Sequence, residues 1–269
     1  MLDDRRRIAV IGLGAMTRDL RASFKLSGGS FDVAAALVSP EHSVTADCGG
    51  DLKIFRDPAD LAAWHPSLVV ECASHSAVRT AVPVLLRLGI DTVIVSIGSL
   101  ADPALLRELE AAATIGKSRL TVASGAIGGL DVLRAAKLAG LSSVAYTGTK
   151  PSSAWQGTNA ESLCDLSAIS VPTTFFEGSA EQASRLFPKN ANVTAAVALA
   201  GIGFEKTTVK LVADPDGLSN HHQVTAQGAF GEFTICLRNE PLPDNPKTSR
   251  LAALSVQQAV MRHFEAIEM

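Results

Sequence analysis

The sequence predicts an α/β protein with a doubly wound parallel sheet, followed by a second α+β domain with a mixed or antiparallel sheet. Two observations predict the parallel sheet. An apolar run at residues 8–11 leads into a glycine turn and a helical segment, and apolar, β-branched runs then alternate with helical patterns to residue 125. A third observation predicts the second domain, because several alternating runs after residue 125 follow one another without helices between them.

The stretch 7–20 reads RIAVIGLGAMTRDL, which is typical of a strand, glycine turn and helix that seat a pyrophosphate. The two glycines let the backbone approach phosphate oxygens closely, and the helix N-terminus offers free N–H groups. Thr17 departs from the third small residue of the G-x-G-x-x-G pattern. The alternative is a glycine turn in a domain that binds no nucleotide. The expected cofactor contacts in this turn are Gly12, Gly14, Ala15 and Met16.

The predicted second strand, residues 31–38, ends at Ser39, where NAD-specific sites carry an acidic residue that binds the ribose 2′-hydroxyl. Here Glu41 comes only after a proline, and no arginine in this stretch matches a 2′-phosphate. We expect Ser39 to contact the cofactor, and the choice between NAD and NADP stays open.

Small residues follow the other predicted strands of the first sheet, at 73–75, 96–99 and 124–126. Because ligands bind beyond the carboxyl ends of the strands in open α/β sheets, we expect Ala73 and Ser74 to contact the cofactor as well. His75 either contacts a ligand or lies at a helix start in solvent.

The predicted domains are residues 1–125, which bind the dinucleotide, and residues 126–245, an α+β domain that carries the second sheet and candidate substrate residues. A final helix is expected over 248–267, within the segment 246–269 that packs back on the first domain, and residues 245–249 carry its start signals. Its apolar positions at helical spacing are Leu251, Leu254, Met261 and Phe264.

Composition excludes several classes of protein. A net charge of -3 gives no electrostatic footprint for nucleic acid. No apolar run is long enough to span a membrane, and no secretory signal is evident. The four cysteines have no paired spacing, which argues against a metal site or a disulfide framework and favours a cytoplasmic location.

The segment 219–227, SNHHQVTAQ, alternates between two faces of a predicted strand. His221 shares the polar face with Gln223, whereas His222 shares with Val224 the face that should point to the interior or a cleft. His222 is therefore the candidate catalytic residue, because an imidazole gives and takes protons near neutral pH. The alternative is a core histidine with no catalytic role.

Three further segments carry cationic or amide groups. Residues 187–193, FPKNANV, place Lys189 and two asparagines at a predicted helix start, which favours anions. Lys150 opens the second segment, KPSSAWQGT, and Lys247 opens the third, at the start of the last helix. The alternative for each is a solvated lysine or a capping residue. The predicted substrate contacts are Lys189, Lys247, Thr248 and Ser249.

Six motifs, kept in the same order, resemble those of the L-aspartate dehydrogenase family. They are ASGAIGGLD at 123–131, KPSSAWQGT at 150–158, FEGSA at 176–180, FPKNANVTAAVALAG at 187–201, ADP to NHH at 213–222, and PLPDNPKTS at 241–249. FPKNANV is the most distinctive, and the similarity extends over nearly the whole chain. The resemblance implies a Rossmann domain with a second α+β domain, a homodimer, cofactor contacts at Ala126 and Asn192, and His222 as the active-site residue.

The function implied by the resemblance is reversible, NAD- or NADP-dependent oxidation of L-aspartate to oxaloacetate and ammonia through iminosuccinate. The resemblance also suggests that the imine is supplied to NAD biosynthesis. One alternative is another reductase with the same two-domain plan that acts on a cyclic imine or an aldehyde. A second is a sensor that binds NAD or NADP without turnover.

Overall fold

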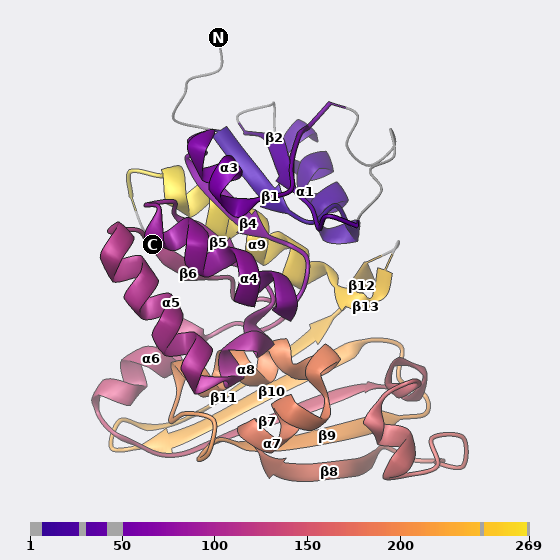
Figure 1. Ribbon diagram of the computed structural model, residues 1–269. Helices are drawn as coiled ribbons and strands as arrows, with labels where there is room; N and C mark the ends of the chain where they lie inside the picture. The colour runs from indigo at the N-terminus through magenta and orange to yellow at the C-terminus, as the bar shows by residue number, and fades with distance from the viewer. Residues whose placement is uncertain (1–6, 27–30, 42–50, 243–244, 268–269) are drawn as a thin grey trace. The chain divides into compact units, whose positions relative to one another are not determined.

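The computed structural model describes residues 7–26, 31–41, 51–242 and 245–267 (Figure 1). Contacts between Cα atoms divide the chain into two compact units. The first consists of Met1–Ala123 together with Ala253–Met269, and the second is Ser124–Ala252. Among the described helices, none has the length and apolar character that crossing a membrane requires.

A parallel sheet forms the centre of the first unit. Among the described residues its strands lie in the order β3-β2-β1-β4-β5-β6, and every neighbouring pair is parallel. This is the strand order of dinucleotide-binding Rossmann domains, in which the order reverses between β1 and β4. The predicted fold class is therefore confirmed. The strands are β1 (Arg7–Ile11), β2 (Asp32–Leu37), β3 (Lys53–Phe55), β4 (Leu68–Glu71), β5 (Thr92–Ile94) and β6 (Leu120–Val122).

Helices cover both faces of this sheet, as unbroken apolar strands require. Leu20 and Phe24 of α1 pack in one buried cluster with Val256 and Val260 of the C-terminal helix and with side chains of β1, β2, β4 and β5. Asp102 caps α5 through the backbone N–H of Ala104, as the sequence predicts. The helices are α1 (Ala15–Leu26), α3 (Pro58–Ala63), α4 (His75–Arg87), α5 (Pro103–Gly116) and α9 (Arg250–Phe264).

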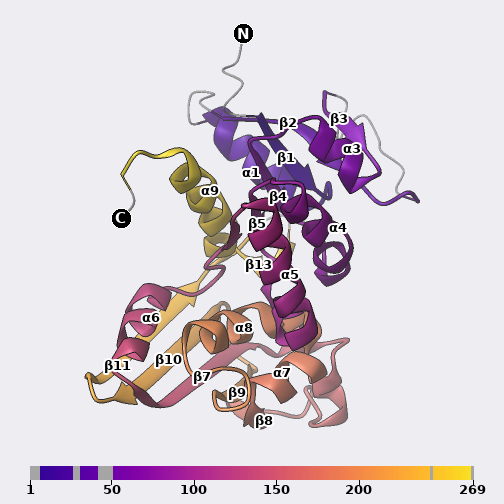
Figure 2. The same cartoon turned by 60° about the vertical axis from the view of Figure 1, so that its left-hand side comes forward.

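The second unit contains a mixed sheet in the order β11-β10-β7-β9-β8 over its described residues. The pair β7 and β9 is parallel and the other neighbours are antiparallel. Helices α6, α7 and α8 lie over one face of this sheet (Figures 1 and 2). The helices and strands of the second unit are α6 (Leu130–Leu138), β7 (Leu141–Pro151), β8 (Thr173–Ser179), α7 (Ala180–Leu186), α8 (Ala191–Ala200), β9 (Thr208–Asp214), β10 (Asn220–Gly228) and β11 (Gly231–Asn239). Strands β12 (Pro241–Leu242) and β13 (Asn245–Ser249) form a separate two-stranded sheet.

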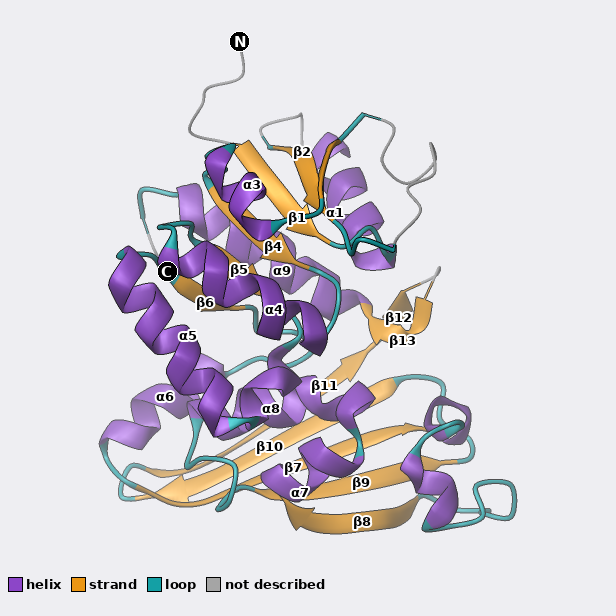
Figure 3. Cartoon of the chain, in the orientation of Figure 1, coloured by secondary structure: helices purple, strands orange, loops and turns teal. Residues whose placement is uncertain are grey.

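The expected start of the last helix was wrong. Residues 245–249 are not its first turn: they form β13, which pairs with β12 before α9 begins at Arg250 (Figure 3). Ser249 still acts in the start of the helix, because its Oγ accepts a hydrogen bond from the backbone N–H of Leu251. Leu254 and Met261 are exposed, since the buried face of α9 is made of smaller side chains that fit close to the sheet. These are Ala253, Val256, Ala259 and Val260.

Replacing Val256 by alanine should lower the free energy of unfolding by about 2 kcal/mol, because two buried methyl groups are lost and a cavity remains. Val256 is fully buried, whereas Leu254 on the same helix is 45% exposed. Leu254→Ala is therefore the control and should change stability by less than about 0.5 kcal/mol. Urea unfolding of both variants checks this, and equal losses would contradict the assignment of the buried face.

Candidate functional site

The glycine turn after β1 is built for close approach. Gly12 has a φ of +90°, and a Cβ there would lie 2.8 Å from the Cβ of Ala73 in the loop after β4. Only glycine readily adopts this positive φ and also leaves the space that a Cβ would fill. Thr17 is buried in α1 and its Oγ1 donates a hydrogen bond of 2.9 Å to the carbonyl oxygen of Gly12. A third glycine is usual at this position. Here the hydrogen bond from the Thr17 hydroxyl supports the turn instead of weakening it.

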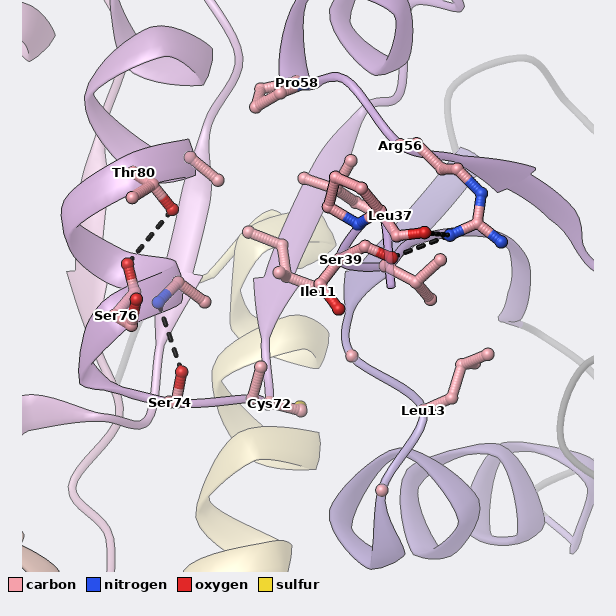
Figure 4. A pocket seen from close by; sticks show the side chains of 17 residues that line it. Ile11, Leu13, Leu37, Ser39, Arg56, Pro58, Cys72, Ser74, Ser76 and Thr80 are labelled. Atoms are coloured by element: carbon pink, nitrogen blue, oxygen red, sulfur yellow. Dashed lines mark hydrogen bonds between the residues drawn. The ribbon is translucent and has the colours of Figure 1, made fainter. Parts of the chain in front are cut away.

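A cavity of about 630 Å³ opens beside this turn, at the carboxyl ends of β1, β2 and β4 (Figure 4). Its volume is in the range of cofactor sites, and its walls are mostly apolar with a few polar groups. Ala15 and Met16 do not line it: they form the first turn of α1, and Met16 packs against the core. The predicted cofactor residues that do line it are Gly12, Gly14, Ser39, Ala73 and Ser74.

Arg56 also lines the cavity, and it corrects the expectation that no arginine lies near Ser39. Its Nη1 donates hydrogen bonds to the carbonyl oxygens of Ser39 at 2.7 Å and Pro40 at 2.9 Å (Figure 4). The arginine follows β3, a short strand that was not predicted and that pairs with β2. A guanidinium at the end of β2 is suited to a ribose 2′-phosphate.

Glu71, at the end of β4, is fully buried and was not predicted as a functional residue. Its Oε1 accepts hydrogen bonds from the backbone N–H groups of Ala73 and Ser74, each at 2.8 Å, and from the hydroxyl of Ser96 at 2.8 Å. Its Oε2 accepts from the N–H groups of Val95 and Ser96. One carboxylate thus joins the loops after β4 and β5 and fixes the backbone that lines the cavity.

In the second unit, the alternation predicted for β10 is confirmed. His222 is 4% exposed and Val224 is buried, whereas Gln223 is exposed. His222 pairs with Gly148 of β7, and the hydroxyl of Tyr146 lies 2.8 Å from His222 Nδ1. A Cβ at Gly148 would lie 2.6 Å from the Tyr146 hydroxyl oxygen, so the glycine makes room for this hydrogen bond.

Lys150 lies on the same face of β7, two residues beyond Gly148. Its Nζ donates a hydrogen bond of 2.6 Å to Oδ1 of Asn190 and lies 5.3 Å from the centre of the Trp155 ring. Asn190 immediately precedes α8, so the motifs KPSSAW and FPKNANV meet at this lysine. This was not foreseen, because both motifs were read separately.

Burial dominates the ionisation of this cluster. It lowers the pKa of His222 to about 3, with smaller contributions from the positive charge of Lys150 and from His221. Burial also lowers the pKa of Lys150 to about 8 and raises that of Tyr146. At neutral pH the imidazole is therefore neutral. In the tautomer with its proton on Nδ1, Tyr146 accepts that hydrogen bond and Nε2 keeps the lone pair that a base needs.

The remaining predicted residues fall in several places. Ala126 is buried and its carbonyl oxygen accepts a hydrogen bond of 2.7 Å from Nδ2 of Asn239, while Asn192 lies in the first turn of α8. Ser249 is buried at the end of β13. The side chains of three predicted substrate contacts lie outside the described part of the structure, and these are Lys189, Lys247 and Thr248.

Metal-binding geometry is not found within the described residues, where no three His, Cys, Asp or Glu side chains converge. The first unit contributes the cavity beside the glycine turn, and the second contributes an imidazole, a phenol and an ammonium group.

Comparison with known proteins identifies relatives over both units. The profile of the C-terminal domain of aspartate dehydrogenase matches residues 131–263, and that of the NAD-binding domain of homoserine dehydrogenase matches residues 12–123. The L-aspartate dehydrogenase of Pseudomonas aeruginosa is 47% identical over 86% of this chain and 88% of its own. That of Cupriavidus necator is 43% identical over 97% and 98%. The crystal structure of Thermotoga maritima aspartate dehydrogenase has a TM-score of 0.74 and 28% identity, covering 98% of this chain and 99% of its own.

Replacing Glu71 by glutamine should destabilise the first unit by about 2 kcal/mol, because an amide cannot accept all the hydrogen bonds that converge on this buried carboxylate. Cofactor affinity should fall as well, since Ala73 and Ser74 line the cavity. Glu108→Gln removes an exposed carboxylate that pairs with Arg87, so it is the control and should change stability by less than about 0.5 kcal/mol. Urea unfolding and cofactor titration check both, and a stable, fully binding E71Q variant would refute this role.

Replacing Arg56 by alanine should weaken NADP⁺ binding by roughly 10-fold or more and NAD⁺ binding by less than about 3-fold, because only NADP⁺ carries the 2′-phosphate. Isothermal titration of each oxidised cofactor measures the two affinities. Arg79→Ala is the control, since Arg79 pairs with Asp102 at the surface. Equal weakening of both cofactors would show that Arg56 supports the shape of the cavity and does not read the phosphate.

Proposed function

The chain belongs to the L-aspartate dehydrogenase family, and we propose that it oxidises L-aspartate to oxaloacetate and ammonia, through iminosuccinate, with NAD or NADP as cofactor. Identities of 43–47% over most of the chain support the family activity. The observation that carries the proposal is the position of His222, which is buried beside Tyr146 and shares a sheet face with Lys150. A proton-transferring group next to a cation suits an anionic substrate whose imine must be hydrolysed.

The first unit fits a dinucleotide. The turn at Gly12 leaves no room for a side chain, the cavity is large enough, and Glu71 fixes the loop that carries Ala73 and Ser74. We propose that the residues of this cavity hold the cofactor, which supplies the acceptor for the hydride that leaves the α-carbon of aspartate. Ala15 and Met16 stay proposed cofactor contacts because they begin the helix after the glycine turn, and Ala126 and Asn192 stay so because of the family resemblance.

His222 is proposed to move protons during hydrolysis of the imine. Neutral Nε2 takes a proton from water as the water oxygen bonds to the carbon of the protonated imine, and the imidazolium returns this proton to the nitrogen. Nε2 then takes the proton of the new hydroxyl group as the carbonyl forms, the carbon–nitrogen bond breaks and ammonia leaves. Tyr146 holds the ring in place through Nδ1, which is the role of an orienting group. The chain's contribution is therefore a positioned base and the exclusion of bulk water around it.

The proposal also includes the roles of the two domains, the oligomeric state and the cellular location. We propose that residues 1–125 bind the dinucleotide, that residues 126–245 bind substrate and form a homodimer contact, and that the C-terminal helix within 246–269 packs on the first domain. We also propose that the protein is cytoplasmic, that it supplies imine to NAD biosynthesis, and that it does not bind nucleic acid or membranes. The family resemblance and the net charge of -3 support these points. Lys189, Lys247, Thr248 and Ser249 stay predicted substrate contacts.

Replacing His222 by alanine should lower the kcat for aspartate oxidation about 10²- to 10⁴-fold, as expected for loss of a general acid–base group. Cofactor affinity should stay within about 3-fold of the wild type. His221→Ala is the matched control, because His221 lies on the opposite face and contacts Ser219, and its kcat should change only a few-fold. If turnover by the H222A variant stays within a few-fold of the wild type, the proposed role of His222 is wrong.

A further inference from the structure

We propose that the ammonium group of Lys150 binds one carboxylate of the dicarboxylic substrate beside His222. This inference rests on the function proposed above and assigns a substrate contact to a residue outside the predicted set. Lys189 and Lys247 remain predicted substrate contacts, and Lys150 is added to them as a lysine whose side chain lies in the described part of the structure.

The register of the second sheet brings Lys150 to His222. His222 pairs with Gly148, so Tyr146 and Lys150, two residues to either side of Gly148, are its diagonal neighbours on the same face. Diagonal neighbours in antiparallel strands have Cα atoms about 7–8 Å apart, a distance that long side chains bridge. Because Gly148 has no side chain, none separates Tyr146 from Lys150 on this face, and the phenol of Tyr146 occupies the position that a Cβ would fill.

The positive charge of Lys150 has no negative partner in the described part of the chain. The groups around it are the imidazole of His222 and the phenol of Tyr146 from the sheet, the amide of Asn190 from the turn before α8, and the indole of Trp155. All of these are neutral at pH 7. A buried charge is costly unless it is paired, and the ammonium group has three donors, of which Asn190 occupies one. A substrate carboxylate would supply the missing charge and accept a further hydrogen bond.

The ionisation of the cluster agrees with this placement. Burial lowers the pKa of Lys150 to about 8, and the charge of Lys150 contributes to the low pKa of His222. A carboxylate bound to Lys150 offsets both effects, so it holds the lysine protonated and makes the imidazole a stronger base. Substrate binding would therefore raise the pKa of His222 by offsetting the contribution of Lys150, while burial, the largest cause of the low pKa, remains.

Lys210 shows what a lysine without such a role looks like in the same sheet. It pairs across β9 and β7 with Thr147, which places it on the opposite face from Tyr146 and Lys150. Its side chain is 47% exposed and its Nζ lies 3.3 Å from the carboxylate of Glu177. Lys210→Met is therefore a matched control for the removal of one lysine.

The test is the affinity of the full-length protein, loaded with reduced cofactor, for succinate, which has both carboxylates and no amino group. Isothermal titration should show that Lys150→Met weakens succinate binding roughly 10- to 100-fold, whereas Lys210→Met stays within about 3-fold of the wild type. Lys150→Arg should keep most of the affinity because it keeps the charge. A K150M variant that binds succinate within about 3-fold of the wild type would overturn the proposal.

The pH dependence gives a second readout that a structural role for Lys150 would not produce. Wild-type affinity for succinate should fall as the pH rises through about 8, because the free lysine loses its proton there while succinate keeps both charges. The K150R variant should show no such fall, since a guanidinium stays protonated. An unchanged pH dependence in K150R would contradict the assignment.

If K150M does not fold, as judged by circular dichroism, Asn190→Asp takes its place. The new carboxylate would pair with Lys150 and should weaken succinate binding about 10-fold. Unchanged affinity would overturn the proposal.

The outcomes distinguish this proposal from the proposed function. If succinate binding depends on Lys150 but aspartate is not oxidised with either cofactor, the proposed function is refuted and the carboxylate site stands. Aspartate oxidation with an unchanged KM in K150M would refute the carboxylate site and leave the function standing.

Discussion

The hydrogen bond between Tyr146 and His222 depends on the absence of a side chain at Gly148, and the chemistry of the second unit depends on this hydrogen bond. The phenol crosses the space above Gly148 to reach Nδ1 of the imidazole, so any side chain there would collide with the hydroxyl. Strand β7 supplies Tyr146, Gly148 and Lys150 at alternate positions, and it lies at the centre of the mixed sheet between β10 and β9. A central strand holds all three groups on a rigid support.

The first unit also depends on a buried polar group at a strand, and in this unit it is the carboxylate of Glu71. Glu71 is the last residue of β4 and is buried, and five hydrogen bonds from two loops surround its carboxylate. A buried carboxylate is tolerated because its acceptors are satisfied, and the same bonds hold the loops that line the cavity. In both units, a strand of the sheet carries a buried polar group, and the neighbouring backbone or side chains are arranged to satisfy it.

Much of this arrangement follows from local patterns in the sequence. The alternation of residues 219–227 was sufficient to place His222 inside and Gln223 outside, because a strand has a period of two. The turn at Gly12 was equally clear. The role of Thr17 could not be predicted in the same way. It depends on a hydrogen bond from its hydroxyl to the carbonyl oxygen of Gly12, which only the fold shows.

The contacts that escaped prediction are those made across distant segments. Arg56 reaches Ser39 because β3 pairs with β2, and β3 is too short to be recognised by its periodicity. Glu71 follows three apolar residues in the sequence, and the loops that surround its carboxylate come together only in the fold. Lys150 and Asn190 are 40 positions apart, and their contact depends on the packing of α8 over the sheet. Sequence motifs identified these segments without indicating that they meet.

The central claim is that this chain takes a hydride from the α-carbon of aspartate. The most direct measurement uses L-aspartate carrying deuterium at that carbon, incubated with the protein and each oxidised cofactor in turn, followed by mass spectrometry of the reduced cofactor. We expect the reduced nicotinamide to carry one deuterium when the labelled substrate is used. Recovery of both cofactors unreduced and without label, from a folded protein that binds them, would contradict the account.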